Sequence, residues 1–90
     1  MPRIVQALIK QERARGFEPR GLRLPSKFGC RACENRNKGP WTVTVVGREL
    51  DKERIYLFTV ITLCARCMRR RRAAVRPILD RLTEWFVSRN

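Results

Sequence analysis

Two short stretches, Cys30-Arg-Ala-Cys33 and Cys64-Ala-Arg-Cys67, decide how this sequence folds. Each has two residues between its cysteines, so one tight turn can present both sulfur atoms to a single tetrahedral ion. Thirty residues separate the two pairs, and the chain contains no other cysteine. The spacing therefore predicts one zinc ion held by Cys30, Cys33, Cys64 and Cys67.

Other uses of two Cys-x-x-Cys pairs fit the sequence less well. Two disulfides would need an oxidising compartment, and the stretch from Met1 to Gln6 lacks the apolar core and cleavage site of a secretory signal. A redox-active pair needs only one Cys-x-x-Cys, usually beside a βαβ pattern that the sequence lacks. An iron–sulfur centre also takes four thiolates and stays open as an alternative. We expect a cytoplasmic, reducing location.

The same four thiolates argue against catalysis. They fill the coordination sphere and leave no position for water or substrate, so the metal is predicted to be structural. The chain has no histidine, the commonest general base, and its eight acidic residues form no catalytic motif. No glycine-rich phosphate loop is present either. We expect neither enzymatic activity nor a small-molecule substrate.

The segment between the cysteine pairs predicts an antiparallel β-hairpin. Residues 41–46 alternate with a period of two, and residues 54–63 are rich in β-branched and aromatic side chains. Residues 47–53 are charged and are predicted to form the loop of the hairpin. Because the second cysteine pair follows the second strand directly, folding the hairpin brings the two pairs together.

The flanks predict helices and an arm. Residues 2–15 predict a short helix with Ile4, Val5, Leu8 and Ile9 on one side, and Gly16 is a natural stop. Residues 17–28 contain two prolines and are predicted to form an extended basic arm outside the core.

A second helix is predicted from Met68 onward. Pro77 should either start its main part or kink a longer helix. One apolar stripe is predicted to pack on the hairpin, and it consists of Val75, Ile78, Leu79, Leu82 and Phe86.

The sequence thus predicts a small α+β fold with a zinc ribbon at its centre, in which a four-cysteine site closes an antiparallel β-hairpin. An N-terminal helix and basic arm occupy residues 1–27, and the ribbon with its C-terminal amphipathic helix occupies residues 28–90. Ninety residues make a single domain with a small core. A bound metal could therefore supply most of the folding free energy, on the order of 10 kcal/mol.

The charge of the chain points to a polyanion as partner. Lys and Arg number 21 against 8 acidic residues, a formal net charge of +13. Four thiolates and one zinc ion would lower this to about +11. A GC-rich genome or a hot habitat could explain the preference for arginine over lysine, but not the total charge. An anionic membrane surface remains a weaker alternative, and no segment approaches the roughly 20 apolar residues of a membrane span.

Many of the basic residues cluster near the cysteines in the sequence. Four consecutive arginines, residues 69–72, follow the last cysteine and would radiate around a helix, so they cannot form one solvated face. One or two of them could neutralise the thiolates, and the others need an external anion such as RNA phosphate. The predicted RNA-binding residues are Arg13, Arg15, Arg20, Arg23, Lys27, Arg31, Arg36, Lys38, Arg66, Arg69, Arg70, Arg71 and Arg72.

Three aromatic residues have two possible roles. Trp41, Tyr56 and Phe58 could stack on unpaired bases, or they could form the core of the hairpin. The sequence leaves both roles open. Phe28, just before the first cysteine pair, is expected to pack over the metal turn.

The paired Cys-x-x-Cys motifs, the small size and the arginine content resemble the small zinc-ribbon ribosomal proteins, particularly those of archaea. That resemblance implies a structural zinc site, contacts to ribosomal RNA and to neighbouring ribosomal proteins, and a location in the ribosome. It covers the architecture and not a sequence signature.

A second resemblance is to the zinc-ribbon transcription elongation factors that bind RNA polymerase. It rests on Phe28-Gly-Cys30 and on Pro77-Ile-Leu-Asp80 followed by Trp85, although the segment between the cysteine pairs is longer here and residues 69–72 are more basic. A sequence-specific DNA regulator is a third possibility, but no helix-turn-helix spacing supports it.

Overall fold

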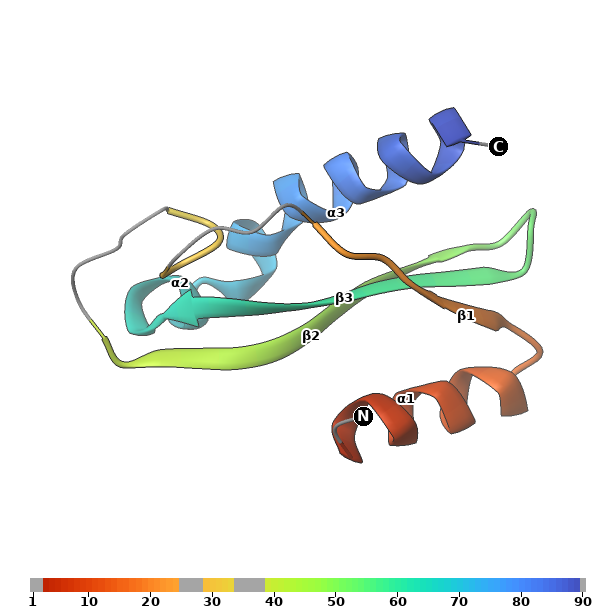
Figure 1. The fold of residues 1–90 in the computed structure, drawn as a ribbon, viewed down its shortest axis with the longest axis horizontal. Helices are drawn as coiled ribbons and strands as arrows, with labels where there is room; N and C mark the ends of the chain where they lie inside the picture. Colours follow the sequence, from red (N-terminus) through yellow and green to blue (C-terminus); the bar gives the residue numbers. More distant parts are fainter. Residues whose placement is uncertain (1–2, 25–28, 34–38, 90) are drawn as a thin grey trace.

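The computed structural model describes residues 3–24, 29–33 and 39–89, and it shows a three-stranded sheet with helices on both faces (Figure 1). The predicted α+β fold, with a four-cysteine cluster at the end of a β-hairpin and helices on either side, is confirmed. The elements in chain order are α1 (Arg3–Ala14), β1 (Glu18–Gly21), β2 (Trp41–Leu50), β3 (Ile55–Cys64), α2 (Ala65–Arg69) and α3 (Arg71–Arg89).

The central hairpin is longer than the sequence predicts. Strand β2 pairs antiparallel with β3 over ten residues, from Trp41 opposite Cys64 to Leu50 opposite Ile55. The expectation of a loop from residue 47 is therefore wrong, because the turn occupies only residues 51–54. Two of the charged side chains that suggested a loop are paired with residues in or next to the flanking helices. Arg48 lies 2.8 Å from Asp80 of α3, and Glu49 forms an ion pair with Arg15, just beyond α1.

The first part of the predicted arm belongs to the sheet. Strand β1 runs parallel to β3, and the amide of Leu22 then donates a 2.9 Å hydrogen bond to the carbonyl of Phe58. Phe17 is only 6% exposed, and its ring lies under the guanidinium groups of Arg15 and Arg54. The extended conformation was predicted correctly, but the expectation that residues 17–24 lie outside the core is wrong. Pairing with β3 satisfies the backbone of this short segment and buries its apolar ends.

The two faces of the sheet have different partners. Side chains alternate along a strand, so consecutive residues within β2, and within β3, point to opposite faces of the sheet. Ile61 and Leu63 lie in one apolar cluster with Val75 and Ile78 of α3. Phe58 lies in a second cluster with Val45 and Val5, against α1 (Figure 1). The apolar stripe of the C-terminal helix is confirmed, with Val75, Ile78 and Leu82 buried and Leu79 and Phe86 half-buried.

Helix α1 is anchored by a charged group as well as by apolar packing. The carboxylate of Glu12 is only 6% exposed and lies 3.0 Å from the guanidinium of Arg15. Hydrogen bonds to Glu49 and then to Glu12 raise the pKa of Arg15. On the apolar side, Val5 is buried, whereas Ile4 is 61% exposed, so the apolar face is narrower than predicted. Arg15 thus joins α1 to the end of β2.

Gly47 is required where a tyrosine ring crosses the sheet. A Cβ atom at residue 47 would overlap the ring of Tyr56, which lies diagonally across on β3. We expect Gly47→Ala to lower the free energy of unfolding by about 1–3 kcal/mol, because the ring must move or the strands must separate. Urea denaturation measures this loss, and Val43→Ala on the same strand is the control because Val43 is 66% exposed.

The same substitution has a spectroscopic readout. Burial, followed by the nearby charges of Glu12 and Glu49, raises the pKa of Tyr56, the only tyrosine of the chain. If Gly47→Ala displaces the ring into water, an absorbance titration will show this pKa returning toward its ordinary value. Unchanged stability together with an unchanged Tyr56 pKa would contradict the close packing of the Tyr56 ring against residue 47.

Candidate metal centre and its arginine surface

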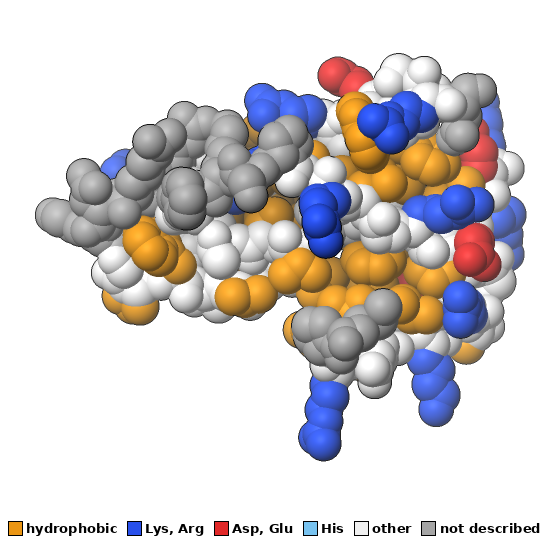
Figure 2. Space-filling view, viewed as in Figure 1, with side chains coloured by type: hydrophobic (Ala, Val, Ile, Leu, Met, Phe, Trp, Pro, Cys, Tyr) orange, Lys and Arg blue, Asp and Glu red, His pale blue; other side chains and the backbone are white. Residues whose placement is uncertain are grey.

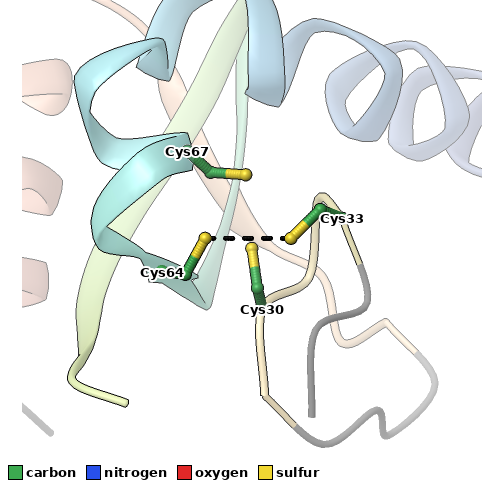
Figure 3. A group of neighbouring side chains, drawn as sticks. All are labelled: Cys30, Cys33, Cys64 and Cys67. Atoms are coloured by element: carbon green, nitrogen blue, oxygen red, sulfur yellow. Dashed lines mark hydrogen bonds between the residues drawn. The ribbon is translucent and has the colours of Figure 1, made fainter. Parts of the chain in front are cut away.

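The four cysteines come together from two parts of the chain. Cys30 and Cys33 belong to the turn at residues 30–33, which we call the first metal turn. Cys64 ends β3 and Cys67 lies in α2 (Figure 3). All four sulfur atoms lie within 4.8 Å of one another, and the Sγ atoms of Cys33 and Cys64 are 3.7 Å apart. The predicted convergence of the two pairs is confirmed.

Backbone contacts hold the first metal turn against the sheet. Gly29 has a φ of 76°, a conformation that other residues rarely adopt. Its carbonyl accepts a 2.6 Å hydrogen bond from the hydroxyl of Thr62, and the amide of Arg31 donates a 2.9 Å bond to the Thr62 carbonyl. Because Thr62 lies two residues before Cys64, these bonds place the first pair of sulfurs beside the second pair.

The second pair is positioned by the start of α2. Cys64 is the N-cap residue, with an extended backbone (φ −72°, ψ 167°), and Cys67 lies one helical turn later. Two residues separated by one helical turn lie on the same side of the helix, so both thiols point toward the first metal turn. The amide of Arg70 then donates to the carbonyl of Cys67 at 3.1 Å and ends the short helix.

The geometry of this cluster fits a metal ion and not disulfides. A disulfide joins sulfurs at about 2.05 Å, whereas the Sγ atoms of Cys33 and Cys64 lie 3.7 Å apart and all four cysteines are free. Four sulfurs at about 2.3 Å from a central zinc ion would lie about 3.8 Å apart in a tetrahedron. Cys30 is fully buried, Cys64 and Cys67 are less than a tenth exposed, and Cys33 is exposed.

The local electrostatics prepare one sulfur for a cation. Burial raises the pKa of Cys30, but hydrogen bonds from the backbone amides of Cys33, Cys64 and Ala32 outweigh it and lower the pKa to about 6. Burial and hydrogen bonds with the other three thiols raise the pKa of Cys67 to about 12. Without a cation, four adjacent sulfurs cannot all carry charge. The cluster therefore has the ligand atoms of a metal site, and a cation would be needed for all four thiols to ionise.

Most of the predicted RNA-binding arginines near this cluster are exposed. Arg66 lies between the cysteines of the second pair, and Arg69, Arg70 and Arg72 follow on α2 and α3. Arg71 differs from them, because its guanidinium donates to the carbonyl of Val45 at 2.8 Å and joins α3 to the edge of β2. Arg31 is half-buried on the first metal turn.

The other predicted contacts lie elsewhere on the fold. Arg13 and Arg20 are exposed on α1 and β1, and Arg23 is exposed just beyond β1. Arg15 is exposed but engaged in the ion pairs with Glu12 and Glu49. Lys27, Arg36 and Lys38 lie outside the residues that the structure describes, as does Phe28.

The three aromatic residues separate into two roles. Phe58 is buried and Tyr56 half-buried, and both belong to the apolar cluster beneath α1. They form the core of the hairpin and are not available for stacking on bases. Trp41 is 39% exposed at the start of β2, so it is the most accessible of the three.

Among the described residues, acidic side chains lie away from the cysteine end, and Glu34, which follows Cys33 in the sequence, lies outside the described residues. Residues 54–79 contain seven arginines and no acidic residue. The acidic side chains that the structure describes lie on α1, on β1, around the turn of the hairpin and on the second half of α3. On the face shown in Figure 2, the red side chains accordingly lie away from the end that carries the first metal turn.

Arg81 also lies on the basic surface at the cysteine end, although it is not among the predicted RNA-binding residues. It lines a hollow beside the first metal turn together with Ala74 and Pro77. Ala74, Pro77 and Arg81 have the spacing i, i+3 and i+7, so a helical projection places them on one face of α3. A helical projection that included the basic residues as well as the apolar ones could have identified Arg81 as a candidate RNA contact.

Comparison with known proteins found no matching family model, no matching curated protein and no matching solved structure. In the part of the chain that the structure describes, no helix is both long enough and apolar enough to cross a bilayer. What the protein does must therefore be inferred from the cysteine cluster and from the arginines around it.

Proposed function

We propose that this protein is a structural RNA-binding component of the ribosome whose fold is stabilised by one zinc ion. Zinc is the metal proposed because four thiolates in a tetrahedral arrangement are its common structural ligand set. Four protein ligands leave no position for substrate, and the chain has no histidine, so the role proposed is structural and not catalytic.

One observation carries the proposal of RNA, namely the separation of charge along the molecule. The surface formed by α2, the start of α3 and the first metal turn has no acidic side chain among the described residues, and it presents several exposed guanidinium groups. Within the described residues, Arg66, Arg69 and Arg70 form no ion pair or side-chain hydrogen bond, so they remain available to an external anion. A net charge of +13 on 90 residues adds a strong general attraction to a phosphate backbone.

The ribosome is the assembly proposed because the whole molecule is basic. Arginines also occur on α1 and β1, where Arg13 and Arg20 are exposed. A protein surrounded by RNA segments can use contacts on several sides, as a scaffold that neutralises phosphates where segments pack closely. The proposed location is therefore the cytoplasm, on a ribosomal subunit, beside other ribosomal proteins.

Sedimentation of a tagged copy from native lysate tests this assignment. We expect the protein to migrate with one ribosomal subunit through a sucrose gradient, and to remain there after a wash with moderate salt. Migration with RNA polymerase instead would favour the elongation-factor alternative. Migration with neither, in a lysate treated to preserve both assemblies, would contradict the ribosomal proposal.

Charge neutralisation at the cysteine end should weaken RNA binding. We expect the triple variant Arg69→Gln, Arg70→Gln, Arg72→Gln to bind RNA about a hundredfold more weakly at 0.1 M salt, with a salt slope smaller by about 2. Each lost phosphate contact removes roughly 0.7 from the slope for single-stranded RNA. Fluorescence anisotropy with a labelled RNA measures both quantities.

The matched control removes three positive charges elsewhere. Arg3, Lys10 and Lys52 are exposed on α1 and in the hairpin turn, and none is a predicted RNA contact. The variant with all three changed to glutamine has the same net charge as the triple arginine variant. Equal losses of affinity in the two variants would show that only net charge matters, and not the cysteine end.

A further inference from the structure

A groove runs between the first metal turn and helix α3. It consists of two hollows that share Ala32 on the turn and Ala74 and Pro77 on the helix. The larger, of about 610 Å³, extends beside the cysteines, and the smaller, of about 100 Å³, extends toward Leu24. Because the two share three lining residues, we treat them as one continuous feature, the metal-turn groove.

The walls of the metal-turn groove are basic at both ends. Arg66 and Arg70 line the larger hollow, and Arg31 and Arg81 line the smaller one. Among the described lining residues none is acidic. Within the described part of the chain, Arg66, Arg70 and Arg81 also make no ion pair or side-chain hydrogen bond. Guanidinium donors therefore border the groove at both ends, with Arg66 and Arg70 at one end and Arg81 at the other.

The middle of the groove is lined with small side chains. Ala32, Ala73, Ala74 and Pro77 form this part, so a polymer backbone can approach the helix closely. Pro77 lies inside α3 and has no amide hydrogen, so the carbonyl of Ala73 receives no hydrogen bond from residue 77. That carbonyl is an acceptor on the same face of the helix, and a ribose 2′-hydroxyl is a donor of suitable chemistry.

We propose that the metal-turn groove holds a single strand of RNA, with one phosphate at Arg66 and Arg70, the next at Arg81, and a ribose against Ala73. This inference rests on the proposed function and specifies where and in what form RNA binds. The smaller hollow, of about 100 Å³, has room for part of one backbone at a time, so a single strand is the form proposed. The Ala73 carbonyl, which lacks a hydrogen bond from residue 77, favours RNA over single-stranded DNA, because DNA lacks the 2′-hydroxyl.

The test compares two arginine triples of equal charge. One variant changes Arg66, Arg70 and Arg81, which line the groove, and the other changes Arg69, Arg72 and Arg76, which are exposed outside it. All replacements are to glutamine, and the probe is a labelled twelve-nucleotide oligouridine measured by fluorescence anisotropy. We expect the groove variant to lose at least tenfold more affinity than the outer variant.

A second variant blocks the groove without changing charge. We expect Ala73→Met to weaken binding of oligouridine about tenfold, whereas Ala7→Met on the exposed side of α1 should leave it unchanged. Both variants should keep their metal and their urea midpoint close to those of the wild type, which separates blocking from unfolding. Oligodeoxyuridine should bind more weakly than oligouridine to the wild type, and this difference should shrink in Ala73→Met.

The outcomes separate this inference from the proposed function. Equal losses in the two arginine triples, with normal binding by Ala73→Met, would overturn the groove and leave RNA binding to the general basic surface. Tighter binding of duplex RNA than of the single strand would also overturn it. So would an acidic peptide such as oligoglutamate that binds the wild type and the outer variant but not the groove variant, because the groove would then be a site for acidic peptides. No binding of any RNA by the wild type would reject the proposed function itself.

Discussion

Replacing Cys64 with serine is expected to abolish both metal binding and cooperative folding. A structural zinc site contributes on the order of 10 kcal/mol to folding, whereas small domains have net stabilities of about 5–15 kcal/mol. Cys64 is the residue where the strand, the second cysteine pair and α2 meet, and it is only 6% exposed. Loss of its thiolate removes one of four ligands and leaves the other three sulfurs crowded together without a cation.

The measurement combines metal content with circular dichroism during urea denaturation. Wild-type protein should contain one zinc ion per chain and unfold cooperatively, and a strong chelator should produce the same unfolded spectrum as Cys64→Ser. Ala65→Ser is the matched control, since it places the same side chain one residue later at an exposed position. A Cys64→Ser protein that unfolds cooperatively without metal would show that the apolar core alone maintains the fold.

The cysteine site was predictable from sequence because its geometry is local. Two residues between thiols fix each pair in one turn, and the second pair follows β3 directly. The alternating pattern of Trp41 to Val46 indicated the strand opposite, and the closed set of four thiols indicated a structural metal. These features depend on residues close in sequence, so no knowledge of the tertiary fold was needed.

The third strand was missed because its pairing is not local. Glu18–Gly21 contains a proline and a glycine, has no alternating pattern, and pairs with residues 37 positions later in the chain. Arg48 and Glu49 were placed in a loop for a similar reason. Their strand conformation depends on Asp80 and Arg15, which come from α3 and from the segment after α1. Such partners become visible only when the helices are placed on the sheet.

Charged side chains have different partners at the two ends of the molecule. Near the hairpin turn, the acidic side chains of Glu12, Glu49 and Asp80 pair with arginines and join the helices to the sheet. At the cysteine end, the proposed metal would hold the chain together, and Arg66, Arg69 and Arg70 have no acidic partner among the described residues. Under the proposed function, a metal in place of ion pairs would stabilise this end of the molecule and leave its positive charge available for RNA.

Leu82→Ala is expected to cost about 3 kcal/mol of stability, the second largest effect after Cys64→Ser. The Leu82 side chain is fully buried where α3 covers the sheet. On either side of it, Asp80 and Thr83 contact Arg48 of β2, at 2.8 and 3.3 Å. These contacts hold the helix in place, so the structure cannot collapse to fill the cavity that the substitution leaves.

Leu82→Ala should leave metal binding unchanged, because Leu82 lies fifteen residues beyond the last cysteine. We expect Leu82→Ala to keep one metal ion per chain and to unfold at a lower urea concentration, with an unchanged dependence of the unfolding free energy on urea. Val87→Ala is the control on the same helix, since Val87 is 61% exposed and its truncation should change stability by no more than about 0.5 kcal/mol. Equal stabilities of the two variants would mean that α3 is not packed on the sheet at Leu82, and loss of metal from Leu82→Ala would mean that the packing of Leu82 is needed to assemble the cysteine site.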